Sequence, residues 1–199
     1  MSNLYVIEGT SNSGKTTTLE TLGYEKNIAI FQEFMKNPKA PRPSLTLKEE
    51  LENQIKFYEL EKERIILAKQ ELLQSKIVFL DRSYISVLAV SYAFEKMGKY
   101  NSYKNALEQY YKMVDENWYI TPEIVFILTA NYEEKLRRNQ ERTGKLKESW
   151  IKEAFEYYQK EFYDIIELPS SKITIDTTNK EKDYAANVIK KILRKGDKK

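Results

Sequence analysis

The chain has 199 residues, of which 41% are hydrophobic and 32% charged, and its formal net charge is +3. This length suits one domain, and the 15 tyrosines, 8 phenylalanines and 2 tryptophans exclude a mainly disordered chain. Cysteine and histidine are both absent, which excludes disulfides, zinc fingers and catalytic triads built on histidine. Reactive chemistry is left to carboxylates, lysine, arginine, hydroxyl groups and the backbone, a set that suits phosphate groups and Mg²⁺.

The net charge and the N-terminal residues indicate whether the protein binds nucleic acid or membranes and where it is located. The balanced charge gives no indication of nucleic-acid binding. No apolar run approaches the ~20 residues that span a bilayer, and the first residues lack the basic and apolar regions of a signal peptide. We therefore expect a cytoplasmic protein that binds neither membranes nor nucleic acid.

Five short apolar runs predict buried strands. They cover residues 4–7, 28–31, 77–80, 124–128 and 173–175. Helical patterns separate the runs, and nothing between them reads as a linker between domains. Strands that alternate with helices predict an α/β fold, in which helices cover both faces of a parallel sheet. Residues 1–199 are expected to form this single domain.

Helix-start signals follow most of these runs. A helix is expected from Thr16, after the first run. A long amphipathic helix is expected from the capping-box spacing Thr46–Glu49 to near residue 75, with Ile55 on its apolar face. Asn131 is expected to cap the next helix, and the spacing Thr178–Glu181 predicts a further capping box.

Residues 9–16 match the pattern G-x-x-x-x-G-K-[ST] at every fixed position. A predicted strand precedes the pattern and a predicted helix follows it, which is the context that a phosphate loop requires. The glycines allow successive N–H groups to point inward, Lys15 places an ammonium against the β- and γ-phosphates, and the Thr16 hydroxyl is a hard ligand for Mg²⁺. The residues expected to bind phosphate are Gly9, Thr10, Ser11, Asn12, Ser13, Gly14, Lys15, Thr16 and Thr17. The sequence therefore predicts a site for ATP and Mg²⁺.

A carboxylate follows the third apolar run. Asp81 stands at the carboxyl end of residues 77–80, where parallel sheets bind ligands, and Arg82 comes directly after it. A nucleotide with Mg²⁺ needs such a carboxylate on a strand beside the phosphate loop. We expect Thr16 and Asp81 to bind the metal, and Arg82 to contact a phosphate. A surface salt bridge at a strand end is the alternative for this pair.

These motifs resemble those of the thymidylate kinase and deoxynucleoside kinase superfamily of P-loop kinases. Residues 4–9 resemble its opening strand with a Glu before the first glycine, and residues 81–83 resemble its D-R motif. Residues 122–128 and 172–178 resemble its fourth strand and the segment whose loop packs on adenine. The resemblance implies the P-loop kinase fold, a five-stranded parallel sheet in the order 2-3-1-4-5 with a basic lid. It also implies a homodimer, and transfer of the ATP γ-phosphoryl group to a nucleoside or a nucleoside monophosphate.

A basic segment stands where this family has its lid. Residues 131–147 carry six basic and three acidic side chains, a net charge of +3 that equals the charge of the whole chain. A basic segment that closes over the transferred phosphoryl group would stabilise its negative charge. The resemblance places the lid at about residues 137–149, with Arg138 and Arg142 as catalytic arginines, because the phosphate loop itself carries no arginine. A solvated helix face with i,i+4 ion pairs is the alternative.

The residues for the phosphoryl acceptor form a weaker pattern. Glu33 follows the second apolar run, where deoxynucleoside kinases carry the Glu that accepts the proton of the attacking hydroxyl. Thymidylate kinases commonly have E-P-G there, and the Pro-Gly is missing here. Arg64 resembles the family's substrate-contacting arginine ahead of the D-R motif, and an exposed helix charge is the alternative. The expected substrate contacts are thus Glu33, Arg64 and Arg82, and the expected catalytic residues are Lys15, Glu33, Asp81, Arg82, Arg138 and Arg142.

Three functions follow from these residues. The first is phosphorylation of a nucleoside monophosphate, as in thymidylate kinases (dTMP to dTDP, or a related nucleotide). The second is phosphorylation of a hydroxyl group on a nucleoside or another small molecule, with Glu33 as base. The third is a GTP-dependent switch, but the chain has no D-x-x-G, and residues 179–183 have one residue too many for N-K-x-D. We therefore expect an ATP-dependent kinase, with a nucleoside monophosphate as the first acceptor class.

Overall fold

In the computed structural model, which describes residues 3–74, 76–142, 146 and 152–196, five parallel strands form one sheet. The strands are β1 (Leu4–Glu8), β2 (Ile28–Phe31), β3 (Ile77–Asp81), β4 (Ile124–Thr129) and β5 (Ser171–Asp176). Their order is β2-β3-β1-β4-β5, and every neighbouring pair is parallel. All five predicted strands and the predicted order 2-3-1-4-5 are thus confirmed.

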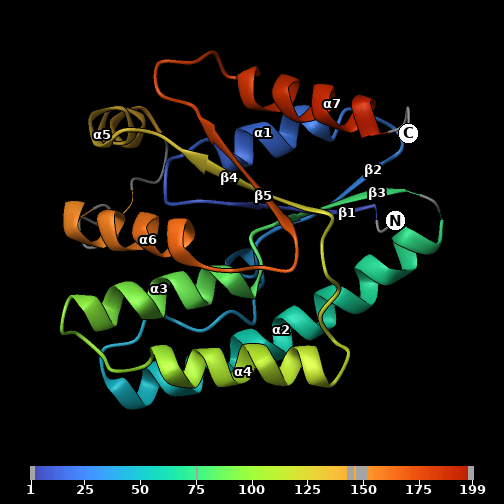
Figure 1. The fold of residues 1–199 in the computed structure, drawn as a ribbon. Coiled ribbons are helices and arrows are strands. Elements are labelled where there is room, and N and C mark those ends of the chain that lie inside the picture. Colours follow the sequence, from blue (N-terminus) through green and yellow to red (C-terminus); the bar gives the residue numbers. More distant parts are fainter. Residues whose placement is uncertain (1–2, 75, 143–145, 147–151, 197–199) are drawn as a thin grey trace.

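Helices connect the strands and cover both faces of the sheet, as predicted. They are α1 (Lys15–Leu22), the 3₁₀ helix η1 (Phe34–Lys36), α2 (Leu47–Leu73), α3 (Tyr84–Lys96), α4 (Tyr103–Asp115), α5 (Tyr132–Glu141), α6 (Glu153–Ile165) and α7 (Tyr184–Gly196). Figure 1 shows α1 and α7 on one face of the sheet, and α2, α3, α4 and α6 on the other. The helix α5 lies beyond the carboxyl end of β4 (Figure 1).

The central strands β1, β3 and β4 supply apolar side chains to both layers. The layer under α2, α3 and α6 contains Leu4, Val6, Val78, Leu80, Val125 and Ile127. The layer under α1 and α7 contains Tyr5, Ile7, Phe79, Phe126 and Leu128. Because both faces are buried, the strands read as continuous apolar runs in the sequence. Their carboxyl ends meet at one edge of the sheet, and this buried framework positions the residues that follow each strand.

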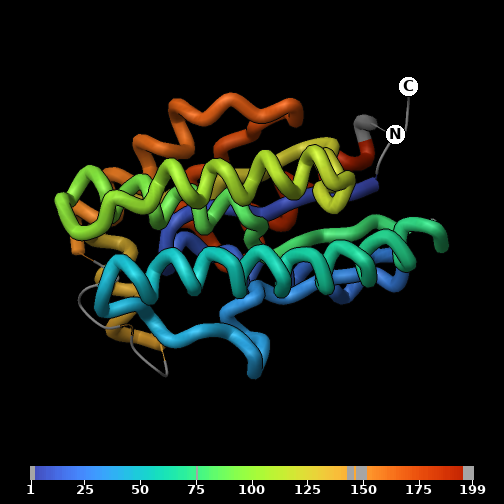
Figure 2. Tube along the Cα trace, turned by 90° about the horizontal axis from the view of Figure 1, so that it is seen from below, coloured from blue at the N-terminus to red at the C-terminus, as the bar shows by residue number. Residues whose placement is uncertain are grey.

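The helix α2 begins at the predicted capping box, where the Thr46 hydroxyl accepts a hydrogen bond from the Glu49 N–H at 3.2 Å. It runs beside α4 on the outside of the molecule (Figure 2). The expectation that Ile55 lies on the buried face is wrong, since its side chain is 52% exposed. The neighbouring Gln54 is buried instead and donates to the Ser91 hydroxyl at 2.9 Å. The buried face of α2 thus includes a polar contact with α3 beside the core residues Tyr58, Ile65 and Ala68.

The predicted capping box at Thr178–Glu181 is also wrong, because α7 begins only at Tyr184. The Thr178 hydroxyl donates to the Asp176 carboxylate at 2.7 Å and accepts from the N–H of Asn131 at 2.9 Å. This side chain therefore joins the end of β5 to the segment after β4, a tertiary contact that the local spacing does not reveal.

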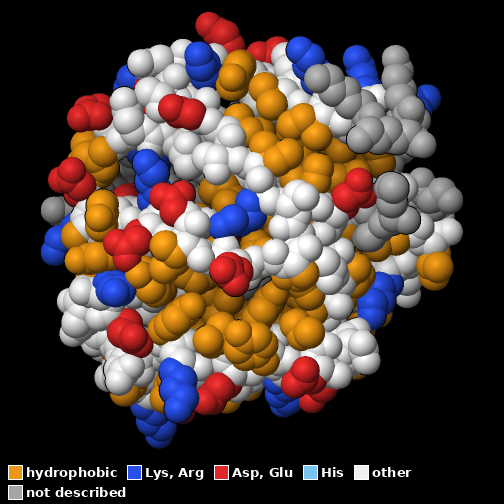
Figure 3. Space-filling view, viewed as in Figure 1, with side chains coloured by type: hydrophobic (Ala, Val, Ile, Leu, Met, Phe, Trp, Pro, Cys, Tyr) orange, Lys and Arg blue, Asp and Glu red, His pale blue; other side chains and the backbone are white. Residues whose placement is uncertain are grey.

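Helix composition and surface charge bear on the predicted absence of membrane and nucleic-acid binding. Within the described residues, none of the helices combines the length and the apolar character that a membrane crossing requires. On the face shown in Figure 3, basic and acidic side chains are interspersed.

Gly9 forms the turn from β1 into the phosphate loop. Its φ is +131°, and a Cβ atom at this position would lie 2.1 Å from the carbonyl oxygen of Leu128 on β4. Gly98 also has a positive φ, +68°, but has open space around its Cβ position. We predict that Gly9→Ala lowers the free energy of unfolding by at least ~2 kcal/mol more than Gly98→Ala does. Urea denaturation followed by circular dichroism measures both, and equal losses would show that the loop moves freely away from β4.

Candidate active site

The loop between β1 and α1 has the form of an anion cradle. Asn12 and Gly14 have positive φ values of 55° and 92°, and Gly14 directly precedes the first turn of α1. The Ser13 hydroxyl donates to the Thr10 carbonyl oxygen at 2.9 Å across the loop. The first turn of a helix and a loop of this shape present N–H groups to an anion. Residues 9–16 therefore form a loop with the shape of an anion cradle, and phosphate binding by these residues stays a prediction.

Lys15 lies buried inside this loop, and its Nζ donates to the Thr10 carbonyl oxygen at 2.6 Å. Burial and, next, the nearby Arg82 guanidinium lower the pKa of Lys15 to about 7, although three nearby carboxylates act in the opposite direction. An anion placed beside the ammonium would restore its charged form. Such a strongly shifted group in a polar loop is typical of a functional site.

Asp81 ends β3 beside the phosphate loop, and its side chain is only 1% exposed. Both of its carboxylate oxygens are buried without a hydrogen-bond partner among the described residues, and the Nζ of Lys36 lies 3.9 Å from Oδ2. Burial raises the pKa of the Asp81 carboxyl, and Lys15 acts against this rise. Buried carboxylate oxygens are normally hydrogen-bonded or bound to a metal, so this position fits a metal ligand.

Thr16, the other predicted metal ligand, is exposed in the first turn of α1. In the part of the chain that the structure describes, no group of three His, Cys, Asp or Glu side chains could enclose a metal by itself. Mg²⁺ that is shared with phosphate groups usually takes only one or two protein ligands and keeps several waters. The pair Thr16 and Asp81 therefore fits a metal held together with a nucleotide.

Glu8, the last residue of β1, joins the phosphate loop to the D-R motif. Its buried carboxylate accepts hydrogen bonds from the Ser83 N–H at 2.7 Å and the Ser83 hydroxyl at 2.8 Å. It also accepts from the Ser86 hydroxyl at 2.5 Å and the Tyr163 hydroxyl at 3.1 Å. The sequence indicated Glu8 only as part of a resemblance, because its partners come from α6 and from the start of α3.

Arg82 has a φ of 61°, a left-handed conformation that costs about 1–2 kcal/mol in a residue other than glycine. Arg64 on α2 supports this turn by donating to the carbonyl oxygens of Asp81 at 2.9 Å and of Arg82 at 2.8 Å. Arg64 also donates to the Gln32 carbonyl oxygen and twice to the Glu61 carboxylate, so all five of its N–H donors are used. The structure thus places Arg64 behind the D-R motif, where it supports the backbone.

The strained turn directs the side chain of Arg82 toward Glu33. The Nε of Arg82 donates to Glu33 Oε2 at 3.0 Å, and its Nη1 donates to the Ser86 hydroxyl at 3.1 Å. Glu33, which follows β2, keeps 25% of its side chain exposed. The structure therefore brings Glu33, Arg82 and Asp81 together at the carboxyl edge of β2 and β3.

The helix α5, which Asn131 caps as predicted, brings basic side chains to the phosphate loop. Arg138 donates to the Asn12 carbonyl oxygen and to both oxygen atoms of Thr177, at distances between 2.7 and 3.0 Å. The Nη1 of Arg142 donates to Asn12 Oδ1 at 3.0 Å. Of the predicted lid, residues 137–142 and 146 are described, and residues 143–145 and 147–149 lie outside the described residues.

Two lysines near the site were not predicted as site residues. Lys135 donates to the Thr10 hydroxyl at 2.6 Å, and Lys36 lies beside Asp81. A helical signal could have identified Lys135, because it stands three residues before Arg138 on one helix face. The proline-rich sequence placed Lys36 in a loop, and only the 3₁₀ turn η1 brings it to Asp81.

A protein-family model described as "AAA domain" matches residues 4–172. The chain belongs to the AAA domain family. Comparison with curated proteins gave no match. Among solved structures, deoxyadenosine kinase from M. mycoides with bound dCTP has a TM-score of 0.64 at 16% identity, covering 96% of this chain and 99% of that chain. Thymidylate kinase from Candida albicans has a TM-score of 0.66 at 17% identity, covering 98% of this chain and 92% of that chain. This AAA domain protein therefore has the P-loop kinase fold that its motifs predicted.

Binding of ATP to this AAA domain protein should draw a proton onto Lys15. Above the Lys15 pKa of about 7 the free protein holds this side chain mainly neutral, whereas an adjacent triphosphate favours the charged form. We predict that ATP affinity falls by up to about tenfold per pH unit between about pH 7.5 and 9. Titration calorimetry in two buffers of different ionisation enthalpy measures the matching uptake of about one proton. Affinity and proton balance that stay constant over this range would contradict the role of Lys15.

Proposed function

We propose that the protein is a Mg²⁺-dependent kinase that transfers the γ-phosphoryl group of ATP to a nucleoside or a nucleotide. The observation that carries the proposal is that the loop of Lys15 and the buried Asp81 carboxylate, which accepts no hydrogen bond from the described residues, follow neighbouring strands at one edge of the sheet. A loop of this kind binds the phosphates of ATP. The solved structures that share the fold are a deoxyadenosine kinase and a thymidylate kinase, which supports the same class of reaction.

The donor half of the site consists of the phosphate loop and the metal ligands. The loop N–H groups and Lys15 would hold the β- and γ-phosphates. Thr16 and Asp81 would hold Mg²⁺, which when bound neutralises charge on the phosphates. Through its hydrogen bonds to Ser83, Glu8 joins the strand that leads into the phosphate loop to the residues that follow Asp81.

The acceptor half of the site favours a hydroxyl group. Arg64, a predicted substrate contact, has no free N–H donor, and the Nε of Arg82 is paired with Glu33. A hydroxyl acceptor benefits from a general base, whereas a phosphate acceptor is already ionised. Glu33 is partly exposed and is oriented by Arg82, so it supplies that base. Glu33 accepts the hydroxyl proton, the hydroxyl oxygen bonds to the γ-phosphorus, and the bond to the β–γ bridging oxygen breaks to release ADP.

The two lid arginines divide into different roles. Arg138 makes four hydrogen bonds, to Glu134, Asn12 and Thr177, and so holds α5 against the loop. Among the described residues, the exposed side chain of Arg142 donates one hydrogen bond, to the side chain of Asn12. Its guanidinium therefore has donors left for the phosphoryl group that is transferred, whose charge a cation would stabilise.

A nucleoside monophosphate is the second candidate acceptor. The likeness to the thymidylate kinase of Candida albicans favours it. Lys36, whose side chain is 43% exposed beside Asp81, is the cation that would meet the acceptor phosphate. The homodimer and the cytoplasmic location stay predictions.

Turnover with a panel of acceptors distinguishes the two candidates. With Mg²⁺ and ATP, we predict ADP release in the presence of nucleosides. Glu33→Gln should lower kcat for them by about 10²-fold or more, because the general base is lost, while ATP affinity stays the same. Glu63→Gln, at an exposed carboxylate paired with Lys39, is the matched control and should retain full turnover. Release of ADP only with monophosphates, insensitive to Glu33→Gln, would exclude the hydroxyl acceptor.

Asp81→Asn separates a role in the site from a role in stability. Burial raises the pKa of this carboxyl in the folded state. At a pH above the pKa of Asp81 in the unfolded chain, the charged carboxylate therefore destabilises the folded state. Removing the charge should then not lower Tm. We predict an unchanged or raised Tm together with a Mg²⁺ requirement for half-maximal turnover that increases by about tenfold or more. Thermal melts and Mg²⁺ titrations of turnover measure both. An unchanged Mg²⁺ requirement would remove Asp81 from the metal site.

A further inference from the structure

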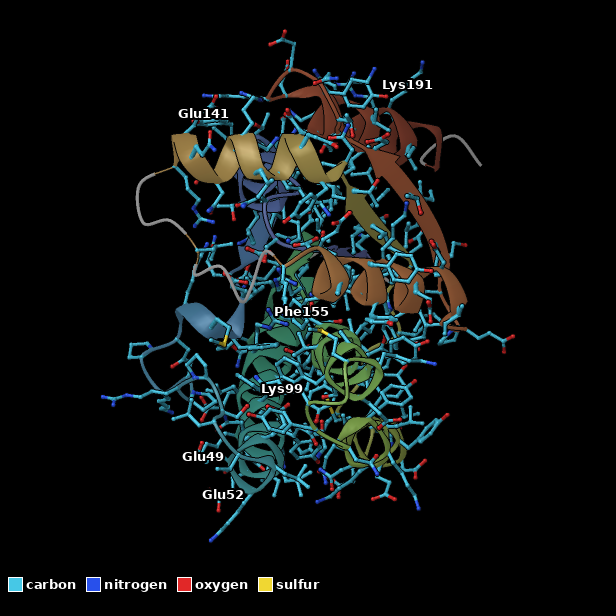
Figure 4. All side chains as sticks on the ribbon, turned by 90° about the vertical axis from the view of Figure 1, so that its left-hand side faces the viewer. Glu49, Glu52, Lys99, Glu141, Phe155 and Lys191 are labelled. Atoms are coloured by element: carbon cyan, nitrogen blue, oxygen red, sulfur yellow. The ribbon has the colours of Figure 1, made fainter. Side chains whose placement is uncertain are left out.

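A buried ion pair joins the two helices that flank the predicted lid. The Nζ of Lys135 on α5 donates to Glu156 Oε2 on α6 at 2.6 Å, and the two side chains are 9% and 6% exposed. The pair thus joins α5, which ends at Glu141, to α6, which begins at Glu153. Figure 4 faces the carboxyl edge of the sheet and shows α5 above α6, with Glu141 at the end of α5 and Phe155 in the first turn of α6.

The same ammonium group reaches the phosphate loop. The Nζ of Lys135 donates to the Thr10 hydroxyl at 2.6 Å, and Thr10 is buried. The carbonyl oxygen of Thr10 is the acceptor for Lys15 at 2.6 Å. Thr10 is therefore held by two lysines, through its hydroxyl by Lys135 and through its carbonyl by Lys15. A shift of α5 would move the residue to which Lys15 is bound.

The side chain of Asn12 makes a second set of contacts between the phosphate loop and α5. The Nδ2 of Asn12 donates to the Lys135 carbonyl oxygen at 3.3 Å, while its Oδ1 accepts from Arg142 at 3.0 Å. Two residues of the phosphate loop, Thr10 and Asn12, thus contact α5. The placement of Arg142 over the loop depends on the same stretch of α5 that carries Lys135.

The ion pair is not the arrangement that stability alone favours. Oε1 of Glu156 is buried and has no hydrogen-bond partner among the described residues. A buried ion pair gains little over an apolar pair of the same size, and an unsatisfied buried oxygen adds a cost. A charged pair in this place therefore indicates a role in positioning.

We propose that Lys135 and Glu156 are positioning residues for ATP binding and phosphoryl transfer, an inference that rests on the proposed function. They hold Thr10, and through it Lys15, at the phosphates of ATP. They also join α5 to α6, so that Arg142 stands over the phosphate loop. The pair therefore affects both the affinity for ATP and the rate of transfer.

The experiment compares Thr10→Val, Thr10→Ser, Lys135→Met and the double variant of Thr10→Val with Lys135→Met. Titration calorimetry with ATP and no acceptor gives Kd, and turnover with the acceptor found in the panel gives kcat and KM. We expect Thr10→Val and Lys135→Met each to weaken ATP binding about tenfold and to lower kcat by up to about 10²-fold. Thr10→Ser keeps the hydroxyl and should recover most of both. The double variant should be no worse than Lys135→Met, because both changes remove one contact.

Thr10→Val keeps the ion pair and so tests the contact even if Lys135→Met fails to fold. Lys190→Met is the matched control, since it removes an ion pair with Glu25 at 2.9 Å on the surface of α7. A folded Thr10→Val protein with the Kd and kcat of the unaltered chain would overturn the proposal, as would additive effects in the double variant. If the unaltered chain does not bind ATP, the proposed function fails and this inference fails with it. If the unaltered chain binds ATP and the variants have the same Kd and kcat as that chain, this inference alone is overturned.

Discussion

The hydrogen bonds to the Glu8 carboxylate join the phosphate loop to the D-R motif. Glu8 ends β1 directly before the phosphate loop, and its partners Ser83 and Ser86 stand at the start of α3, just after Asp81. Tyr163 adds a bond from α6. A buried carboxylate is costly unless several donors satisfy it, so these elements have to assemble together. The distance between the phosphate loop and Asp81 follows from that assembly, and the remaining features of the site depend on it.

Asp81 is buried like Glu8, but neither of its carboxylate oxygens has a hydrogen-bond partner in the part of the chain that the structure describes. Two further unfavourable features occur within the same site: the left-handed backbone of Arg82 and the lowered pKa of Lys15. Strain, unsatisfied groups and shifted pKa values that cluster in one place are typical of sites built for a ligand. A nucleotide with its metal would relieve two of these features, by placing a cation at Asp81 and an anion at Lys15.

Much of the fold and part of the site could be predicted from sequence, because those features depend on neighbouring residues. Continuous apolar runs identified the central strands, and the turn chemistry of residues 9–16 identified the phosphate loop. The errors arose where a partner from another element intervened. Ile55 is exposed, whereas the neighbouring Gln54 is buried and donates a hydrogen bond to the Ser91 hydroxyl on α3. The role of Arg64 as a substrate contact stays a prediction, and in the fold its N–H donors bond to Glu61 and to backbone carbonyl oxygens around the D-R motif.

The sequence by itself therefore determined the class of fold, the strand order through a resemblance, and the residues of the phosphate loop and of the D-R motif. These follow from chain geometry over a few residues, or from motifs whose spacing is local. Only the tertiary structure decided that Lys135 meets Thr10 and Glu156, and that Glu33 pairs with Arg82. Such pairs come from elements far apart in the chain, and the distances between them are set when helices dock on the sheet, which no local pattern encodes.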